Sequence, residues 1–554
     1  MNEANLNFFL GSYENSVSQT LEALQKDKII QRIRAADYTV WKPKPDNIVN
    51  RLGWLHAPAD LLDQLPYIRS VLDPIIAEGY KDAVLLGMGG SSLAAEMYVK
   101  MFGCRSGHPL LRILDTTDPA AISRISQELD WEKTIFLVSS KSGTTLETVS
   151  LFYYFYNLAL KKSGSSACRN FIIITDPDSP LEELAHRLHL RHIFKSNPAI
   201  GGRYSALAFP GIIPATLLGI EVEVLLKNAL AFAENDETCF FQGKPNSASS
   251  VLGASLGTLA RMGRDKLTLI FPQSWMPFGD WVEQLIAEST GKEGKGILPV
   301  CEKELKHPEF YNNDRFFVIF HTEENVESKI SEIHEAGHPV VAIKVDSKFH
   351  LGSRMFLWEM ATAIAGHILG INPFDQPNVE ASKILTRQMI ELYRKKKEFP
   401  PEQAAMSTEE CDVYGGISTK SPAEALENFL AEAKSGNYVC LQVYLKSTPE
   451  TDEALHKLSM EISNKYRLAV SSGYGPRYLH STGQLHKGDS GKGLFIQFTS
   501  DDPRDIEIPD NPGVSGSTLT FGICKSAQAL GDRQALIRLG RKIIRFHLKK
   551  NAVA

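Results

Sequence analysis

Paired cysteines are missing from this sequence. Its 554 residues include 7 cysteines, and no two of them form a Cys-x-x-Cys pair. The odd count and the wide spacing argue against a disulfide framework and against a cysteine-based zinc site. The cysteines stand at positions 104, 168, 239, 301, 411, 440 and 524. This usage is typical of a reducing compartment, so we predict a cytoplasmic protein without a metal site.

A basic leader and a long apolar run are also missing. The first residues, MNEANLNFFLGSYENS, carry acids early and no basic region, which argues against a secretory signal. The least charged stretch, Ala206 to Ile220, is interrupted by Pro210 and Pro214. Because a membrane span needs a longer unbroken apolar run, we expect no membrane partner.

No charge of one sign dominates the composition. The formal net charge is -5, with 23% charged and 43% hydrophobic residues, which is ordinary for a globular protein. The basic run at 394–397 is interpreted as the solvated end of a helix. Nothing in this balance favours nucleic acid as a partner.

Short apolar runs alternate with helical periodicity along most of the chain. Such runs occupy residues 83–90, 111–117, 134–140, 171–177, 267–272, 315–321, 339–345, 438–445 and 493–499. The alternation predicts an α/β fold in which parallel sheets are covered on both faces. Because the chain is too long for one core, we expect several units. These are a helical segment (1–75), a first α/β domain (76–230), a second α/β domain (231–395), a linker (396–422) and a smaller C-terminal α/β or α+β unit (423–554).

A glycine-rich loop, GMGGSS, follows the first predicted strand and begins a helix. Its backbone amides, around Gly90 and Ser91, and the positive end of the helix favour an anion. The motif departs from GxGxxG because Ser92 stands where the third glycine would be, which disfavours a dinucleotide. Packing of helix against strand is the alternative interpretation.

A second loop, SSKSGTTLET at 139–148, also follows a buried strand and begins a helix. Seven of its ten residues carry a hydroxyl or an ammonium group. A phosphate monoester binds to many short donors at a helix N-terminus. Capping of the helix would need only one or two of these side chains, so the loop indicates a phosphate site.

Four further segments offer reactive side chains. Arg203 follows two glycines that let the backbone approach a ligand. Glu288 begins ESTGK at the end of an amphipathic helix, where the helix dipole suits a base. NPFDQPNVEASK ends in Lys383, and YGPRYLHSTGQLH is a polar segment between strands. Taken alone, Arg203 could equally form an ion pair within a loop, and Glu288 could equally be an ordinary surface residue.

In combination these segments resemble the glucose-6-phosphate isomerase family. SSKSGTTLET resembles the phosphate loop of sugar-isomerase (SIS) domains, and GGRYS, ESTGK and NPFDQPNVEASK resemble the family's three further signatures, in the same order. The resemblance spans about residues 30–395 and implies two SIS-type doubly wound parallel-sheet domains. The last signature usually has a glycine where this chain has Asn378.

The chain is more similar still to the isomerase half of bacterial bifunctional transaldolase/glucose-6-phosphate isomerases. WKPKPDNIVNRLGW near the start and GYGPRYLHSTGQLHKG near the end carry this resemblance. The chain has no room for the transaldolase half, so we expect no second activity of that kind.

The resemblance implies reversible isomerisation of glucose 6-phosphate and fructose 6-phosphate through a cis-enediol, without metal or cofactor. It also implies a homodimer whose partner is a small sugar phosphate. Glu288 would carry the proton, Arg203 would stabilise the enediolate, and Lys383 would take part in ring opening. Gln376 would line the pocket. The phosphate would be held at Gly90 and by the side chains of Ser91, Ser140, Lys141, Ser142, Thr144 and Thr145.

The ring-opening histidine is not found where the family has it. The region after ESTGK offers His307 and His321, whereas the His-Ser-x-Gly-Gln pattern of the family matches His480 to Gln484, about 190 residues further on. We therefore predict that the C-terminal unit supplies His480, whose side chain suits proton transfer near neutral pH. His307, His350 and His486 are the alternatives.

Two other functions stay open. One is isomerisation of another hexose phosphate, such as mannose 6-phosphate or glucosamine 6-phosphate, because the phosphate end is common to all of them. The other is a sensor that binds a sugar phosphate without turnover. A sensor would not need Glu288, Arg203 and Lys383 together, so their combination favours the enzyme.

Overall fold

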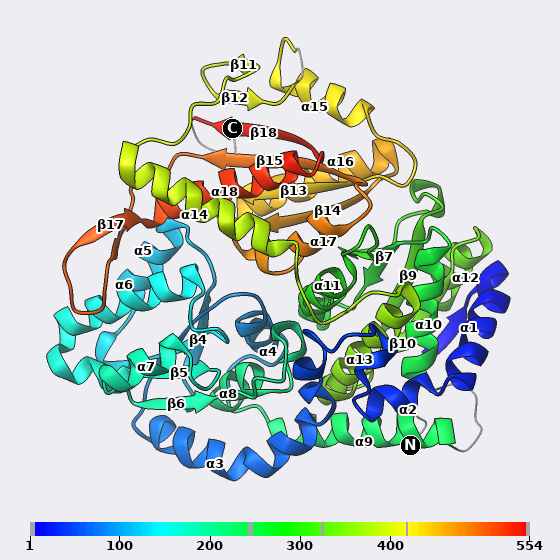
Figure 1. Ribbon diagram of the computed structural model, residues 1–554, viewed down its shortest axis with the longest axis horizontal. Coiled ribbons are helices and arrows are strands. Elements are labelled where there is room, and N and C mark those ends of the chain that lie inside the picture. The colour runs from blue at the N-terminus through cyan, green and yellow to red at the C-terminus, as the bar shows by residue number, and fades with distance from the viewer. Residues whose placement is uncertain (1–5, 242–246, 323–325, 417–418, 550–554) are drawn as a thin grey trace.

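A computed structural model describes residues 6–241, 247–322, 326–416 and 419–549. Three sheets of five or six strands lie at different places in the molecule, with helices around and between them (Figure 1). The predicted α/β class, with parallel sheets as the main elements, is confirmed. No helix of the described residues is long and apolar enough to cross a membrane.

The first α/β domain contains five parallel strands in the order β3-β2-β4-β5-β6. Alternate residues of its strands point into two separate cores, for example Leu85 into one and Val84 into the other. Both faces of the sheet are therefore buried, which explains why the strands are continuous apolar runs in the sequence. The strands are β2 (Asp82–Gly87), β3 (Leu110–Leu114), β4 (Thr134–Ser139), β5 (Phe171–Thr175) and β6 (His192–Lys195). The helices are α4 (Leu93–Phe102), α5 (Pro119–Glu128), α6 (Leu146–Ser163), α7 (Pro180–Arg187) and α8 (Phe209–Leu217).

The second α/β domain has a sheet in the order β1-β10-β9-β7-β8. Four strands are parallel, and β1 (Leu6–Phe9) pairs antiparallel with β10 at the edge. The remaining strands are β7 (Lys266–Ile270), β8 (Leu298–Glu302), β9 (Arg315–His321) and β10 (Val340–Lys344). The helices are α9 (Val222–Phe241), α10 (Ala248–Arg261), α11 (Met276–Thr290), α12 (Glu327–Glu335), α13 (Leu351–Leu369) and α14 (Val379–Lys396).

The N-terminal segment does not stand apart as a helical unit. It contains α1 (Glu14–Lys26), α2 (Ile29–Arg34) and α3 (Ala57–Ala77), but its strand β1 belongs to the second domain's sheet. Four residues are too few for a periodicity signal, and only the partner strand makes them a strand. The expected boundary at residue 230 also falls inside α9.

The third unit is a mixed sheet in the order β11-β12-β18-β15-β13-β14. Its strands are β11 (Met406–Ser407), β12 (Cys411–Tyr414), β13 (Tyr438–Tyr444), β14 (Ala469–Tyr474), β15 (Gly493–Ser500) and β18 (Lys542–Leu548). Its helices are α15 (Pro422–Ala431), α16 (Pro449–Tyr466), α17 (Gly483–Gly488) and α18 (Phe521–Arg538). We expected a linker at 396–422. The segment instead contributes strands to this sheet, since β12 pairs antiparallel with β18.

The third unit packs closely on the first domain. The hairpin of β16 (Glu507–Pro509) and β17 (Ser517–Thr520) lies against α6, and α14 packs along α18. Ile508, Leu519 and Phe521 belong to the same apolar cluster as the strands of the first domain. The C-terminal unit is therefore joined to the rest by a shared core, and Figure 1 shows it above both domains.

Candidate functional site

The two predicted ligand loops lie side by side at the carboxyl ends of neighbouring strands. Gly87 pairs with Ser139 at the ends of β2 and β4, so GMGGSS and SSKSGTTLET leave the sheet at adjacent points. Ligands of open α/β sheets bind outside the carboxyl ends of the strands. The parallel pairing therefore places both loops at the expected edge.

The hydroxyl groups of the second loop form their own hydrogen bonds. Ser140 Oγ donates to Thr145 Oγ1 at 3.2 Å, and the Ser142 and Thr144 hydroxyls are 3.1 Å apart. Gly143 has φ +66°, and a Cβ there would lie 2.8 Å from the Leu181 nitrogen. Thr145 immediately precedes α6, so the hydroxyls gather at the positive end of a helix.

Lys141 differs from these hydroxyls because its ammonium group already has partners. Its Nζ lies 2.5 Å from Asp176 Oδ2 and donates to the Pro198 carbonyl at 3.0 Å. Burial lowers the pKa of Lys141, and Asp176 opposes that shift. A contact between Lys141 and phosphate stays a prediction.

The glycine-rich loop is packed directly on the GGRYS segment. A Cβ on Gly90 would lie 2.1 Å from the Gly202 carbonyl oxygen, so no other residue fits there. Ser205 Oγ donates to the Gly90 carbonyl at 3.2 Å. This close approach holds Arg203 next to the loop that carries Ser91.

Arg203 connects three motifs that are far apart in the sequence. Its side chain is 2% exposed, and its Nη1 lies 3.2 Å from Glu288 Oε1 and donates to Gln376 Oε1 at 3.2 Å. It also donates from Nε to Ser289 Oγ at 2.7 Å and from Nη2 to the Pro373 and Asp375 carbonyls at 2.5 and 3.0 Å. GGRYS, ESTGK and NPFDQ thus meet at one guanidinium group.

Glu288 lies in the last turn of α11 with its side chain 13% exposed. The side chain of Gln284, one turn earlier, donates to Glu288 Oε2 at 3.2 Å and to the His480 carbonyl at 2.9 Å. The carboxylate is held on both oxygens and still reaches solvent, as a base that meets a substrate must.

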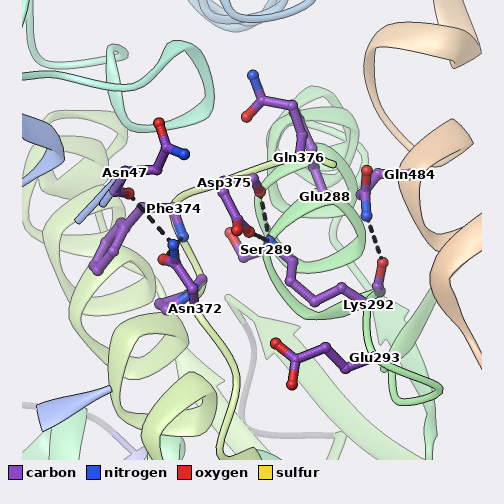
Figure 2. Close-up of polar contacts among 12 residues, drawn as sticks. Asn47, Glu288, Ser289, Lys292, Glu293, Asn372, Phe374, Asp375, Gln376 and Gln484 are labelled. Atoms are coloured by element: carbon purple, nitrogen blue, oxygen red, sulfur yellow. Dashed lines mark hydrogen bonds and ion pairs between the residues drawn. The ribbon is translucent and has the colours of Figure 1, made fainter. Parts of the chain in front are cut away.

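Lys292 fixes the NPFDQ loop to the ESTGK turn. Its Nζ donates to the Asp375 carbonyl at 2.5 Å and to Asp375 Oδ1 at 2.8 Å (Figure 2). Burial lowers the pKa of Lys292 to about 8, and the charge of Arg203 adds to the shift. The sequence motif included this lysine, but no pattern indicated its partner.

His480 enters the same region from the third unit. Its Nε2 lies 2.9 Å from Glu147 Oε1, and its side chain is 21% exposed. Burial lowers the pKa of His480, but the charge and hydrogen bond of Glu147 outweigh this effect and raise it overall. Burial likewise raises the pKa of Glu147, and the charge of His480 reverses the shift. His480 of the C-terminal unit thus contacts a residue of each of the other two domains, and its role in ring opening stays a prediction.

The other histidines lie elsewhere. His307 is 61% exposed and is paired with Glu309 and Glu332. His486 is fully buried in the third unit against Cys440, and His350 is at the start of α13. Among the interactions of the described residues, the hydrogen-bond and ion-pair partners of Arg203 and Glu288 include none of these three histidines.

Lys383 and Gln376 are more exposed than Arg203 and His480. The Lys383 ammonium lies 2.6 Å from Glu380 Oε1, and its side chain is 42% exposed. Its positive charge opposes the rise in the pKa of His480 that Glu147 causes. Gln376 is exposed and contacts Arg203. A role for Lys383 in ring opening stays a prediction.

Sequence reasoning missed three polar residues that support the site. Glu147 is part of SSKSGTTLET but was given no role, although this acid in the first turn of α6 is only 4% exposed and is the partner of His480. Gln284 and Gln484 are both buried. Gln484 donates to the Gly291 carbonyl at 2.8 Å (Figure 2). Only the final Gln of the His-Ser-x-Gly-Gln match pointed toward any of them.

Gln484 also explains the unusual asparagine. Its amide donates to Asn378 Oδ1 at 2.7 Å, and its Oε1 accepts from the Asn378 nitrogen at 3.0 Å. Asn378, where the family usually has glycine, therefore anchors α17 of the third unit to the NPFDQ loop.

A cavity of about 460 Å³ lies behind the ESTGK turn. Leu485, Tyr438 and Lys266 are in its wall, and none of the predicted site residues lines it. The candidate site is instead the partly exposed surface around Glu288, Arg203 and His480, which the convergence of the motifs identifies.

The α/β fold of this chain is also found in solved structures. Two solved structures align with a TM-score above one half. A glucose-6-phosphate isomerase from Chlamydia trachomatis has TM-score 0.58 and 18% identity over 70% of this chain and 87% of its own. A hypothetical protein from Thermus thermophilus has TM-score 0.56 and 24% identity over 69% of this chain and 99% of its own. These structures show the fold alone.

Sequence comparisons show which family this chain is similar to. The family model described as Phosphoglucose isomerase matches residues 75–296. The chain is 28% identical to a glucose-6-phosphate isomerase of Rubrobacter xylanophilus, over 66% of this chain and 94% of that protein. It is also 28% identical to one of Campylobacter jejuni, over 56% of this chain and 86% of that protein. The predicted resemblance to the glucose-6-phosphate isomerase family is confirmed, while the closer resemblance to the bifunctional proteins stays a prediction.

Proposed function

We propose that this protein is a glucose-6-phosphate isomerase, which interconverts glucose 6-phosphate and fructose 6-phosphate. The observation that carries the proposal is the ion pair of Arg203 and Glu288, at 3.2 Å. Gln284 connects this pair to His480, because its side chain donates both to Glu288 and to the His480 carbonyl. A base, a cation for the developing oxyanion and an imidazole are what an aldose-ketose isomerisation requires. The relatives named above carry the same activity in their names.

The reaction begins with substrate binding and ring opening. The phosphate binds at the hydroxyls of Ser140, Ser142 and Thr145 at the N-terminus of α6. His480 gives a proton to the ring oxygen as the bond between that oxygen and the anomeric carbon breaks. The anomeric hydroxyl releases its proton to solvent, and the open-chain sugar results. Glu147 holds the imidazole through the 2.9 Å contact and favours its protonated form.

The proton transfer between carbons follows. Glu288 takes the proton from C2 of the aldose, and the electron pair moves to the carbonyl oxygen, which leaves an enediolate. Arg203 stabilises the negative charge because its guanidinium group lies beside the base. Glu288 returns the proton to C1, a proton moves between the two oxygens, and the ketose is formed. No atom is gained or lost.

A coupled assay tests this function. Fructose 6-phosphate is supplied, and glucose 6-phosphate is followed through a dehydrogenase. We expect turnover, and its absence together with tight binding would favour the sensor. Mannose 6-phosphate and glucosamine 6-phosphate, assayed in parallel, test the other isomerase hypothesis. We further propose a cytoplasmic homodimer that binds neither nucleic acid nor membrane, which sedimentation and fractionation would examine.

A substrate that cannot form a ring isolates the role of His480. Fructose 6-phosphate without its 5-hydroxyl lacks the ring oxygen, so it stays open, but Glu288 can still exchange its C1 proton with deuterated water. We expect His480→Ala to lose at least about tenfold in turnover of fructose 6-phosphate and to keep this exchange. His307→Ala is the matched control. Full activity of His480→Ala with loss in His307→Ala would refute the assignment.

A further inference from the structure

Arg477 lies three residues before His480, in the short turn Arg477–His480 that carries the imidazole. Its Nη1 lies 3.2 Å from Asp115 Oδ2, and its Nη2 is paired with Glu96 and lies 4.0 Å from Asp280 Oδ2. Glu96 is on α4, Asp115 follows β3, and Asp280 is on α11. One side chain of the third unit thus contacts both other domains.

The carboxylates around Arg477 are already connected to the ligand loops. Ser92, the residue after Ser91, donates its hydroxyl to Asp115 Oδ2 at 3.1 Å. Lys100 lies 2.8 Å from Glu96. Burial opposes ionisation of Glu96, but the charge of Arg477 lowers the pKa of this carboxyl to about 2. Glu96 and Arg477 are therefore both charged near neutral pH.

The backbone at His480 has little room to move. A Cβ on Gly89 would lie 2.9 Å from His480 Cβ and 2.9 Å from its carbonyl oxygen. The imidazole has to meet Glu147 on α6 while its carbonyl meets Gln284 on α11. A shift of the turn by about one ångström would lose both contacts, and catalysis depends on such distances.

We propose that Arg477 is a positioning residue for ring opening, because it fixes the turn that carries His480 against the first and second domains. The inference rests on the proposed isomerase function and extends it to a residue that touches no substrate. Arg477 lies outside the family match of residues 75–296. It acts through His480 and leaves the Glu288 step alone, since Glu288 is held by Arg203 and Gln284.

Arg477→Lys tests the proposal. Lysine keeps the charge but cannot present a planar fork to two carboxylates at once. We expect kcat for fructose 6-phosphate to fall at least about tenfold, with KM nearly unchanged. Exchange of the C1 proton in the open-chain ketose without the 5-hydroxyl should stay within about twofold of the unsubstituted protein. Arg504→Lys, an exposed arginine of the same unit, is the control.

Equal loss of both reactions, or no loss of either, would overturn the proposal. If Arg477→Lys does not fold, Asp115→Asn removes one carboxylate, leaves the pair with Glu96, and should show the same selective loss. If the unsubstituted protein does not isomerise the sugar, the proposed function has failed. The NMR titration of His480 then decides the positioning role, which predicts a lower His480 pKa in Arg477→Lys because Glu147 is no longer in contact.

Discussion

Arg203 is the residue at which the sequence motifs become one site. Its buried guanidinium group has hydrogen-bond or ion-pair partners in ESTGK and NPFDQ, and its own segment packs on Gly90. A lysine would reach one of these partners, whereas the planar fork of arginine reaches several. The same group that arranges the loops is therefore available to the negative charge of an enediolate.

Glu288→Gln removes the proposed base without changing its size. The amide keeps a hydrogen-bonding oxygen for Gln284 but cannot take a proton from carbon. We expect kcat to fall by about three or more powers of ten, with little change in binding. The measurement is the coupled assay together with calorimetric affinity for the sugar phosphate. Glu293→Gln, on the same turn but 48% exposed, is the control; near-normal turnover of the Glu288 variant would remove it from the mechanism.

Ser140→Ala combined with Thr145→Ala tests the phosphate loop. The change deletes the two hydroxyls that are hydrogen-bonded to each other at 3.2 Å and leaves the apolar cores unchanged. Affinity for the sugar phosphate should weaken by about 1–3 kcal/mol for each charged hydrogen bond lost. Isothermal calorimetry measures this loss. Ser165→Ala with Ser166→Ala, both exposed after α6, should leave affinity unchanged; equal affinity in both double variants would place the phosphate elsewhere.

Among the elements, α18 supports the site from behind. Lys525, Gln528 and Asp532 are spaced by three and four residues, so they share one face of the helix. Gln528 donates to Glu147 Oε1 at 2.6 Å, which holds the partner of His480. Asp532 accepts from Tyr478 at 2.7 Å and pairs with Lys487 at 2.5 Å. A helix outside the family match thus orients residues on both sides of the imidazole.

The short helix α17 carries a histidine that makes the fold sensitive to acid. His486 is fully buried, and burial lowers its pKa to about 3. Between that value and the unfolded value near 6.5, the unfolded chain binds more protons, so stability falls as pH falls through this range. At about pH 5 the loss should be about 2 kcal/mol.

His486→Leu should remove this part of the acid sensitivity. The unfolding midpoint in denaturant, measured at several values between about pH 7.5 and 5, should fall less in the variant, whatever its offset at the upper end. His307→Leu, in which an exposed histidine is replaced, should keep the full pH dependence. Parallel curves for His486→Leu and the unsubstituted protein would contradict the assignment.

On the scale of the whole molecule, the third unit is not an independent appendage. Its hairpin residues share an apolar cluster with the first domain. Lys525, 3% exposed, lies 3.0 Å from Asp118 of the first domain and 2.5 Å from Asp502 of its own unit. Because the core continues across the boundary, we expect both parts to unfold together in one calorimetric transition.

Lys525→Met tests this coupling. The change leaves the buried carboxylate of Asp118 and the partly buried one of Asp502 without their cation, which should cost about 3 kcal/mol and lower the thermal midpoint. Lys542→Met, which removes an ion pair that is 46% exposed on both sides, should cost at most about 1 kcal/mol. Differential scanning calorimetry measures both. Two separate transitions in the unsubstituted protein, or equal effects of the two variants, would show that the parts are not coupled.

The sequence by itself indicated the α/β class, most strands of the first two domains and the two candidate ligand loops after β2 and β4, but not the edge strands β6 and β8. These features are local, since apolar runs of strand length and small or hydroxylated residues at strand ends need no knowledge of distant partners. The edge strand β1, the strands within 396–422 and the continuity of α9 were missed, because pairing or packing with remote segments decides them.

Only the tertiary structure decided which charged side chains meet. Lys141 was expected at the phosphate and is bound to Asp176, while Glu147, without a predicted role, holds His480 from 333 residues away. Coulomb energy and hydrogen bonding depend on distances of a few ångströms. The sequence specifies such distances only between residues that are close along the chain. The sequence therefore determines which groups are available, and the packing of the three units determines which of them lie close together.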